Sequence, residues 1–227
     1  FVRAEDGRRD RLVTGVRTCA LPIFLYCHFL LMKVAGIDGV IIDWSGAADV
    51  FDYAGINRAT GLAIEAAERF GLEYAICYED RTLRARVDAG RITPEEAADR
   101  AQDDMRYLAA HWLSRPGHLR IDGRPVLLVF GPEYLSDAQW QSVLDDMPSN
   151  PAFITLHQRR EPADGLYAWP PMWASKSEVR TPERLAVYFG RYAERAADST
   201  YSIPAAFPGF HDIYAEAGAQ ESHGVLH

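Results

Sequence analysis

The stretch Gly39-Val-Ile-Ile-Asp-Trp44 is followed by an amphipathic run over Asn57–Phe70 and then by Tyr74-Ala-Ile-Cys-Tyr-Glu79. Short apolar runs of this kind predict strands buried on both faces, and the longer amphipathic run between them predicts a helix. Gly71 directly follows the helical run and is suited to end it in the left-handed conformation. The segment therefore predicts two parallel strands joined by a helix.

The same alternation continues along the chain. Capping boxes at Thr93–Glu96 and Ser136–Gln139, and a Thr-Pro pair at Thr181–Pro182, predict helix starts. Apolar residues at helical spacing from Ala97 to Trp112 predict the body of one of these helices. Four further strands are predicted, at Val126–Phe130, Ala152–His157, Gly165–Trp169 and Tyr201–Phe207.

The choice between a barrel and an open sheet depends on the residues at the carboxyl ends of the strands. Neither the GxGxxG pattern of a dinucleotide-binding fold nor the GxxxxGK[ST] pattern of an NTPase occurs in the sequence. Instead, polar and aromatic residues come after nearly every strand, which is typical of the site of a (β/α)8 barrel. We expect an α/β fold of this TIM-barrel type, with about six of its eight strand–helix units in the sequence and the first and last strands missing.

Composition narrows the range of partners. The 227 residues carry 24 Lys and Arg against 32 Asp and Glu, a net charge of −8, with no cationic run, which argues against nucleic acid or anionic membrane as a partner. The three cysteines, Cys19, Cys27 and Cys77, show no CxxC spacing, so neither a disulfide framework nor a zinc site is indicated. We expect a soluble protein without cofactor, metal or transmembrane segment, and export and oligomeric state remain open.

The first 23 residues differ from the rest. Phe1–Ile23 contains five arginines against three acidic residues and shows no helical or alternating period. The part RRDRLVTGVRTCALPI resembles a translated sequencing adapter, so we expect Phe1–Ile23 to be non-native and the domain to comprise residues 24–227. The alternative is a signal peptide with Ala20–Met32 as its apolar region, against which stand the polar His28 and the lack of a cleavage site.

Several short blocks of the sequence resemble glycoside hydrolases of family 99 and the related family 71. The blocks are Gly36-Ile-Asp-Gly-Val-Ile-Ile-Asp-Trp44, Glu65–Leu72 leading into Cys77-Tyr-Glu-Asp80, Ile121-Asp-Gly-Arg-Pro-Val126 and Ala206-Phe-Pro-Gly-Phe210. The resemblance covers roughly Tyr26–His227. It implies a barrel enzyme that hydrolyses α-linked polysaccharide or glycan, either mannan-like, as in family 99, or α-glucan, as in family 71.

The resemblance also divides the roles of the residues. The catalytic acid/base carboxylates of the family come after the next strand, in a motif that does not occur before His227, so we expect them beyond this sequence and expect this chain alone to be inactive. Glu79 resembles a conserved family Glu that would accept hydrogen bonds from sugar hydroxyls. Tryptophan rings would stack on sugar faces. The predicted substrate-binding residues are Asp43, Trp44, Tyr78, Glu79, Asp80, Arg81, His157, Trp169, Trp173, Phe210 and His211.

Structural roles are the alternative for these residues. Asp43 could cap a loop, Glu79 could pair with Arg81 or Arg84, and a lone histidine such as His157 is often structural. Trp112 and Trp140 are predicted to be core residues, and the pair Asp103-Asp104 is predicted to be surface charge on a helix. Two other functions stay open, a non-catalytic carbohydrate-binding barrel and a metal-dependent barrel hydrolase; the HxH pair expected for the latter does not occur.

Overall fold

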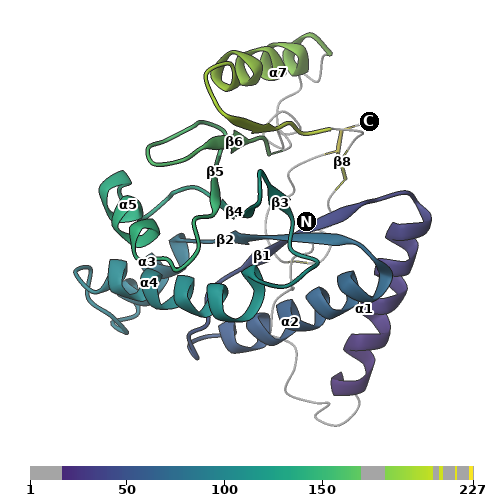
Figure 1. The fold of residues 1–227 in the computed structure, drawn as a ribbon, viewed down its shortest axis with the longest axis horizontal. Coiled ribbons are helices and arrows are strands. Elements are labelled where there is room, and N and C mark those ends of the chain that lie inside the picture. The colour runs from purple at the N-terminus through teal and green to yellow at the C-terminus, as the bar shows by residue number, and fades with distance from the viewer. Residues whose placement is uncertain (1–16, 170–181, 207–209, 212–217, 219–224, 227) are drawn as a thin grey trace. The chain divides into compact units, whose positions relative to one another are not determined.

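A computed structural model describes residues 17–169, 182–206, 210–211, 218 and 225–226. The chain divides into two compact units, residues 1–153 and residues 154–227, and each is described by itself. The helices and strands are labelled in Figure 1. They are, in chain order, α1 (Arg17–Val34), β1 (Gly39–Trp44), α2 (Tyr53–Phe70), β2 (Glu73–Tyr78), α3 (Arg81–Asp88), α4 (Ala97–Leu108), the π-helical turn η2 (Ala109–Leu113), β3 (Arg120–Ile121), β4 (Arg124–Val129), α5 (Asp137–Asp145), β5 (Ala152–Leu156), β6 (Gly165–Tyr167), α7 (Pro182–Ala196), β7 (Tyr201–Ile203), β8 (Phe210–His211) and β9 (Val225–Leu226).

The six predicted strands are all present, as β1, β2, β4, β5, β6 and β7. The order of strands in the sheet, β1-β2-β4-β5-β6-β7, follows the chain without a crossover. Within the first unit β1 pairs with β2, and β2 with β4, in parallel; within the second, β5 pairs with β6, and β6 with β7, in parallel. Parallel strands in chain order with intervening helices have the connectivity of a (β/α)8 barrel, and six of its eight strands lie among the described residues.

Helix ends follow the local sequence signals. Gly71 has φ 65°, the left-handed conformation, and its N–H donates to the last carbonyls of α2. At α5 the backbone N–H of Gln139 donates to the Ser136 side chain and the Gln139 side chain accepts from the Ser136 N–H, so the predicted capping box is confirmed. The reciprocal bonds between Thr93 and Glu96 confirm the other box, which begins four residues before the first residue of α4.

The two faces of the first unit's sheet differ. In the register of β1 and β2, Trp44 lies beside Tyr78 and Asp43 beside Cys77, and successive side chains of a strand point to opposite faces. Trp44 and Tyr78 are fully buried on the face that α4, η2 and α5 cover: Trp44 stacks on Tyr107, at 6.0 Å between ring centroids. Trp112 and Trp140 join the same aromatic layer, which confirms both as core residues.

A β-hairpin that was not predicted joins β3 to β4. Its two central residues, Asp122 and Gly123, have φ 51° and 78°, and β3 pairs antiparallel with β4. Positive φ at both positions is the requirement of a type I′ turn, for which Asp-Gly is a preferred pair. The dipeptide was therefore the available signal.

The described residues of the second unit form three short parallel strands and one helix, apart from the pair β8 and β9. Leu166 of β6, Ala168 and Tyr192 of α7 form its core. The Tyr192 hydroxyl oxygen lies 3.0 Å from the carbonyl oxygens of both Leu166 and Ile203, either of which can accept its single hydrogen, and so it ties β6 to β7. Strands β8 and β9 form a separate antiparallel pair.

The helix α1 begins inside the segment for which no regular element was expected. Arg17–Ile23 is helical, although the sequence shows no helical period there and Pro22 removes one backbone donor inside the helix. Residues 1–16 lie outside the described residues, so the boundary expected at Phe24 stays a prediction. No helix in the described part of the chain is both long and apolar enough to cross a bilayer.

Candidate functional site

Charged side chains gather where β1, β2 and β4 end. Asp43 is the penultimate residue of β1, Glu79 directly follows β2, and Glu133 lies in the segment after β4. Asp43 and Glu79 share the sheet face opposite Trp44 and Tyr78, because Asp43 is level with Cys77 and Glu79 lies two residues beyond it; the Glu79 N–H extends the ladder by donating to Trp44 O at 3.0 Å. We call Asp43, Glu79, Arg81 and Glu133 the strand-end cluster.

Arg81 is the centre of this cluster. Its Nε donates to Glu79 Oε2 at 3.2 Å, and the side chains of Arg81 and Glu79 are 45% and 11% exposed. Partial burial acts to lower the pKa of Arg81, but the charges of Glu79, Glu133 and Asp43 together raise it. The carboxylates from three strand ends thus lie within electrostatic reach of one half-exposed guanidinium.

Tyr53, at the start of α2, borders the cluster. It is 8% exposed, and the guanidinium carbon of Arg86 lies 5.6 Å from its ring centroid. Burial raises the pKa of the Tyr53 phenol; Arg86 and Arg81 lower it, while Asp52 and Glu79 raise it. The phenol therefore keeps its proton at neutral pH and can serve as a hydrogen-bond donor.

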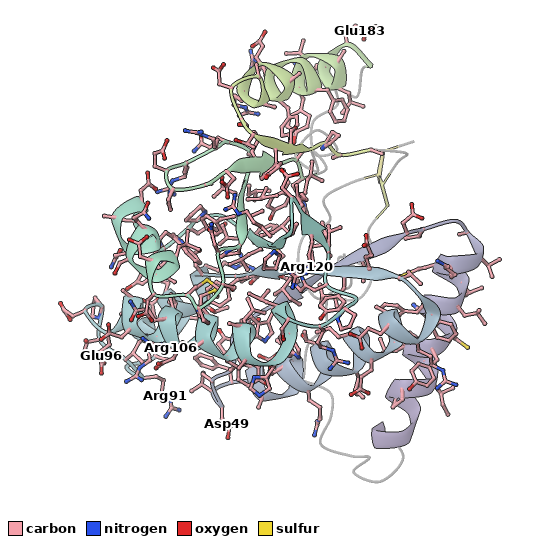
Figure 2. All side chains as sticks on the ribbon, in the orientation of Figure 1. Asp49, Arg91, Glu96, Arg106, Arg120 and Glu183 are labelled. Atoms are coloured by element: carbon pink, nitrogen blue, oxygen red, sulfur yellow. The ribbon has the colours of Figure 1, made fainter. Side chains whose placement is uncertain are left out.

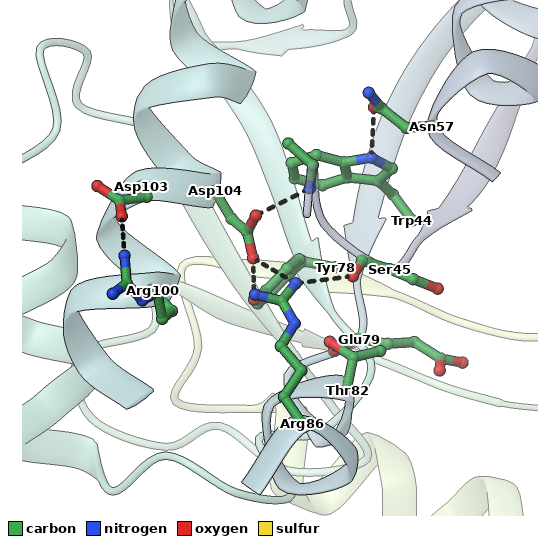
Figure 3. Close-up of polar contacts among 11 residues, drawn as sticks. Trp44, Ser45, Asn57, Tyr78, Glu79, Thr82, Arg86, Arg100, Asp103 and Asp104 are labelled. Carbon is green, nitrogen blue, oxygen red and sulfur yellow. Dashed lines mark hydrogen bonds and ion pairs between the residues drawn. The ribbon is translucent and has the colours of Figure 1, made fainter. Parts of the chain in front are cut away.

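Below the cluster, a buried ion pair holds the loop after β1 (Figure 3). Arg86 Nη2 lies 3.1 Å from Asp104 Oδ2, with side chains only 3% and 5% exposed, and the Tyr78 hydroxyl donates to the same oxygen at 2.8 Å. Asp104 Oδ1 accepts from the Ala47 N–H at 2.8 Å. Burial raises the pKa of Asp104 although Arg86 opposes it. A Cβ at Gly46 would lie 2.5 Å from Asp104 Oδ2, so only glycine fits this close approach.

The prediction that Asp103 and Asp104 are both surface charges was half wrong. Asp103 is exposed and pairs with Arg100 and with Arg106, a residue on the outer side of α4 (Figure 2). Asp104, in contrast, is 3% exposed. It falls on the apolar stripe of α4, three residues after Ala101 and four before Leu108, and this position was the sequence signal for burial.

Asp80 fixes a second loop. Its carboxylate accepts from the backbone N–H groups of Glu133, Tyr134 and Leu135 at 2.8, 3.2 and 3.1 Å. Trp140 Nε1 donates to the same carboxylate at 3.4 Å. Asp80 is fully buried, so it holds the segment after β4 in place beside the end of β2.

These contacts correct three of the predicted substrate-binding residues. Trp44 is fully buried among aromatic rings and its Nε1 donates to Asn57 Oδ1, so it offers no face to a sugar (Figure 3). Tyr78 and Asp80 are also fully buried, and their polar atoms are engaged by Asp104 and by the loop after β4. Trp44 and Tyr78 point to the helix-covered side of the sheet, because they alternate with Asp43 and Cys77, and Asp80 lies on the same side since it accepts from Trp140 Nε1.

In the second unit, His157 follows β5. It has φ 63°, an uncommon conformation for a residue other than glycine, and its ring meets that of Tyr188 edge-on at 6.5 Å. Its Nδ1 is buried and has no hydrogen-bond partner in the described part of the chain. Burial lowers the pKa of His157, as does the charge of Arg195, so the imidazole is neutral at pH 7.

The remaining predicted residues also belong to the second unit. Trp169 is half-buried, and its carbonyl accepts from the Tyr188 hydroxyl at 2.7 Å. Trp173 lies outside the described residues. Phe210 and His211 form β8, of which only the backbone is described.

One cleft of about 370 Å³ lies in the second unit, lined by Gln158, Arg159, Arg195, Asp198 and Ser199. It contains none of the predicted site residues. Two of its lining residues come just after β5 and the other three precede β7, and we assign the cleft no part of the site. Among the described residues, no group of three or more His, Cys, Asp and Glu side chains could hold a metal ion.

Comparison with solved structures identifies similar folds. A protein described as glycoside hydrolase-like matches with a TM-score of 0.63 and 16% identity, over 91% of this chain and 68% of that one. The GH99 endo-alpha-mannosidase from Bacteroides thetaiotaomicron matches with a TM-score of 0.54 and 17% identity, over 85% of this chain and 55% of the enzyme. The same enzyme in complex with bis-tris-propane matches with a TM-score of 0.56 and 17% identity, over 89% and 62%.

No protein-family model matches the sequence, and no curated protein matches it. The chain spans 55–62% of the endo-alpha-mannosidase structures. At identities of 16–17% these matches show a fold like that of GH99 glycoside hydrolases, in agreement with the resemblance of the sequence blocks.

Proposed function

We propose that this chain is the substrate-holding part of a glycoside hydrolase that acts on an α-linked glycan, mannan-like or α-glucan. The carboxyl groups that act as acid and base are assigned to residues outside the described part of the chain. The observation that carries the proposal is the strand-end cluster, in which Glu79 and Arg81 lie with Asp43 and Glu133 at the end of the sheet where this fold builds its sites.

The geometry of Glu79 suits it to bind sugar hydroxyls. A carboxylate offers about four lone-pair positions, and the bond from Arg81 Nε uses one of them on Oε2. Charge-assisted bonds from sugar hydroxyls to such an oxygen are stronger than bonds between neutral groups. Arg81, with nearly half of its side chain exposed, supplies donors for the ring or glycosidic oxygen beside them.

The cluster also limits the substrate. Three carboxylates face one guanidinium, so the cluster is net negative. A uronic acid or a sulfated sugar would meet like charge there, which is destabilising. We therefore assign a neutral glycan to the site.

Binding to the full 227-residue chain tests the proposal. Affinity electrophoresis in gels that contain yeast α-mannan or α-1,3-glucan should show retardation of the wild type by one of the two polymers. Glu79→Gln should lose about tenfold or more in affinity, because the amide replaces a charged acceptor with a neutral one.

The matched control is Glu73→Gln, at the opposite end of the same strand and exposed. It should bind as the wild type does. Equal loss in both variants, or no retardation of the wild type by either polymer, would contradict the proposal.

A further inference from the structure

Phe51, in the loop after β1, has a backbone conformation that its side chain disfavours. Its φ is 52°, and Asp52 follows with φ −102° and ψ 5°. The Tyr53 N–H donates to Val50 O at 3.0 Å and closes a four-residue turn. Positive φ is a conformation that glycine adopts readily and other residues disfavour, so the second position of this turn favours glycine.

Nothing in the fold of the loop accounts for a phenylalanine there. Asn and Asp tolerate positive φ through local hydrogen bonds, but Phe has no polar side-chain atom to form them. The ring is 58% exposed, so its burial contributes little to stability. An exposed aromatic ring held in a conformation that costs free energy is typical of a position kept for binding.

The Tyr53 ring connects Phe51 to the strand-end cluster. The Phe51 ring meets the Tyr53 ring edge-on at 5.4 Å between centroids. Tyr53 in turn lies beneath the Arg86 guanidinium and within electrostatic reach of Glu79 and Arg81. An apolar ring face and a group of charged hydrogen-bonding side chains therefore border the same edge of the sheet.

We propose that Phe51 is the aromatic platform of a sugar subsite, on which one neutral pyranose ring stacks by its C–H face while its hydroxyls reach Glu79 and Arg81. This inference rests on the proposed function and replaces Trp44, which is buried, as the aromatic contact of the first unit. A pyranose ring combines an apolar face with an equatorial rim of hydroxyls, and the neighbouring ring and charges match these two surfaces.

The test separates the ring from the backbone. Phe51→Gly removes the platform and at the same time supplies the residue that the turn favours. The full-length variant should keep or raise the Tm of the wild type, and its affinity for the polymer that the wild type binds should fall about tenfold, measured by the same affinity electrophoresis. Phe51→Trp should bind at least as tightly as the wild type.

The matched control is Phe24→Ala, because Phe24 on α1 is also 58% exposed and lies outside the cluster. It should leave affinity unchanged. In saturation-transfer NMR with a manno- or gluco-oligosaccharide, the ring C–H protons of one sugar should receive magnetisation from the wild type and lose this enhancement in Phe51→Gly.

Each outcome decides between the two proposals. If Glu79→Gln loses binding while Phe51→Gly binds as the wild type does, the platform is overturned and the proposed function stands. If Phe51→Gly loses both Tm and binding, the ring has a structural role and the platform is again overturned. If the wild type binds neither α-mannan nor α-1,3-glucan, the proposed function fails and the platform fails with it.

Discussion

The polar residues at the two ends of strand β2 differ in how much they connect separate parts of the fold. At the amino end the Tyr74 hydroxyl donates to Trp112 O at 2.8 Å, the Leu119 N–H donates to Tyr74 O at 2.7 Å, and His118 packs edge-on against the Tyr74 ring. Arg115 pairs with Glu68 beside them through two bonds. Each of these contacts joins one part of the fold to another.

At the carboxyl end the groups nearest the surface do less for the fold. Arg81 and Glu79 are two residues apart and pair with each other, and Phe51 is exposed in a strained turn. Polar residues at both ends of a parallel strand can therefore look alike in sequence while serving stability at one end and, under the proposed function, binding at the other. Four measurements test this division of roles.

The largest effect is expected from the buried pair beneath the carboxyl end. Arg86→Met should lower the free energy of unfolding by about 3–5 kcal/mol, because it leaves the Asp104 carboxylate buried without its partner. Chemical denaturation measures this loss. The double variant Arg86→Met, Asp104→Leu should recover much of the lost stability. If Arg86→Met alone is as stable as the wild type, the ion pair does not stabilise the fold.

The next effect concerns the amino end. Burial lowers the pKa of His118 to about 4, assisted by the charge of Arg120 and opposed by the bond to Leu119 O. The unfolded chain therefore binds the proton first, and stability is lost as pH falls from about 6.5 toward about 4, by roughly 3 kcal/mol in total.

Denaturation midpoints across this pH range measure the loss. A His118→Phe variant should lose the part of the pH dependence of the unfolding free energy that is due to His118. His111→Gln, at an exposed position on η2, should keep the same pH dependence as the wild type. The same pH dependence in wild type and His118→Phe would contradict the assignment.

A smaller effect is expected at the Glu68–Arg115 pair. Its side chains are 25% and 36% exposed, so Glu68→Gln should cost about 1 kcal/mol or less, and less still at high salt. The bond from Arg115 lowers the pKa of Glu68, so this contribution is present at neutral pH and lost as pH falls below about 4.5. A salt-independent cost would indicate packing rather than charge.

The smallest effect on stability is expected at Glu79. Glu79→Gln should change the free energy of unfolding by no more than about 0.5 kcal/mol, because its partner Arg81 is 45% exposed, although the same variant should lose carbohydrate binding. A loss of stability as large as that of Arg86→Met would show that Glu79 serves the fold, as the buried ion pair does, and not binding.

The sequence alone predicted the strands and helix ends well, because those depend on local patterns. Six apolar runs, two capping boxes and the Gly71 cap all appear in the structure as predicted. The edge of the sheet where the strand-end cluster lies was also predictable, because carboxyl ends of parallel strands meet there.

Side-chain direction was harder to predict. Asp43 and Trp44 are adjacent in sequence but face opposite sides of the sheet, and a residue after a strand, such as Asp80, belongs to either side. The available signal was the alternation of the strand: Trp44 lies two residues after Ile42 and therefore on the same face, and both are buried. The loop conformation that exposes Phe51 left no recognisable pattern, because the turn carries phenylalanine where the usual signal is glycine.

Two buried carboxylates order the loops of the carboxyl edge before any ligand arrives. Asp104 ties the loop after β1 to Tyr78 and Arg86, and Asp80 ties the segment after β4 to the end of β2. The conformational entropy of these loops is thus given up during folding and not during association. A glycan that binds here would meet a pre-organised surface, so calorimetry should find a small entropic penalty from the protein, and most of the ordering on binding should occur in the sugar chain.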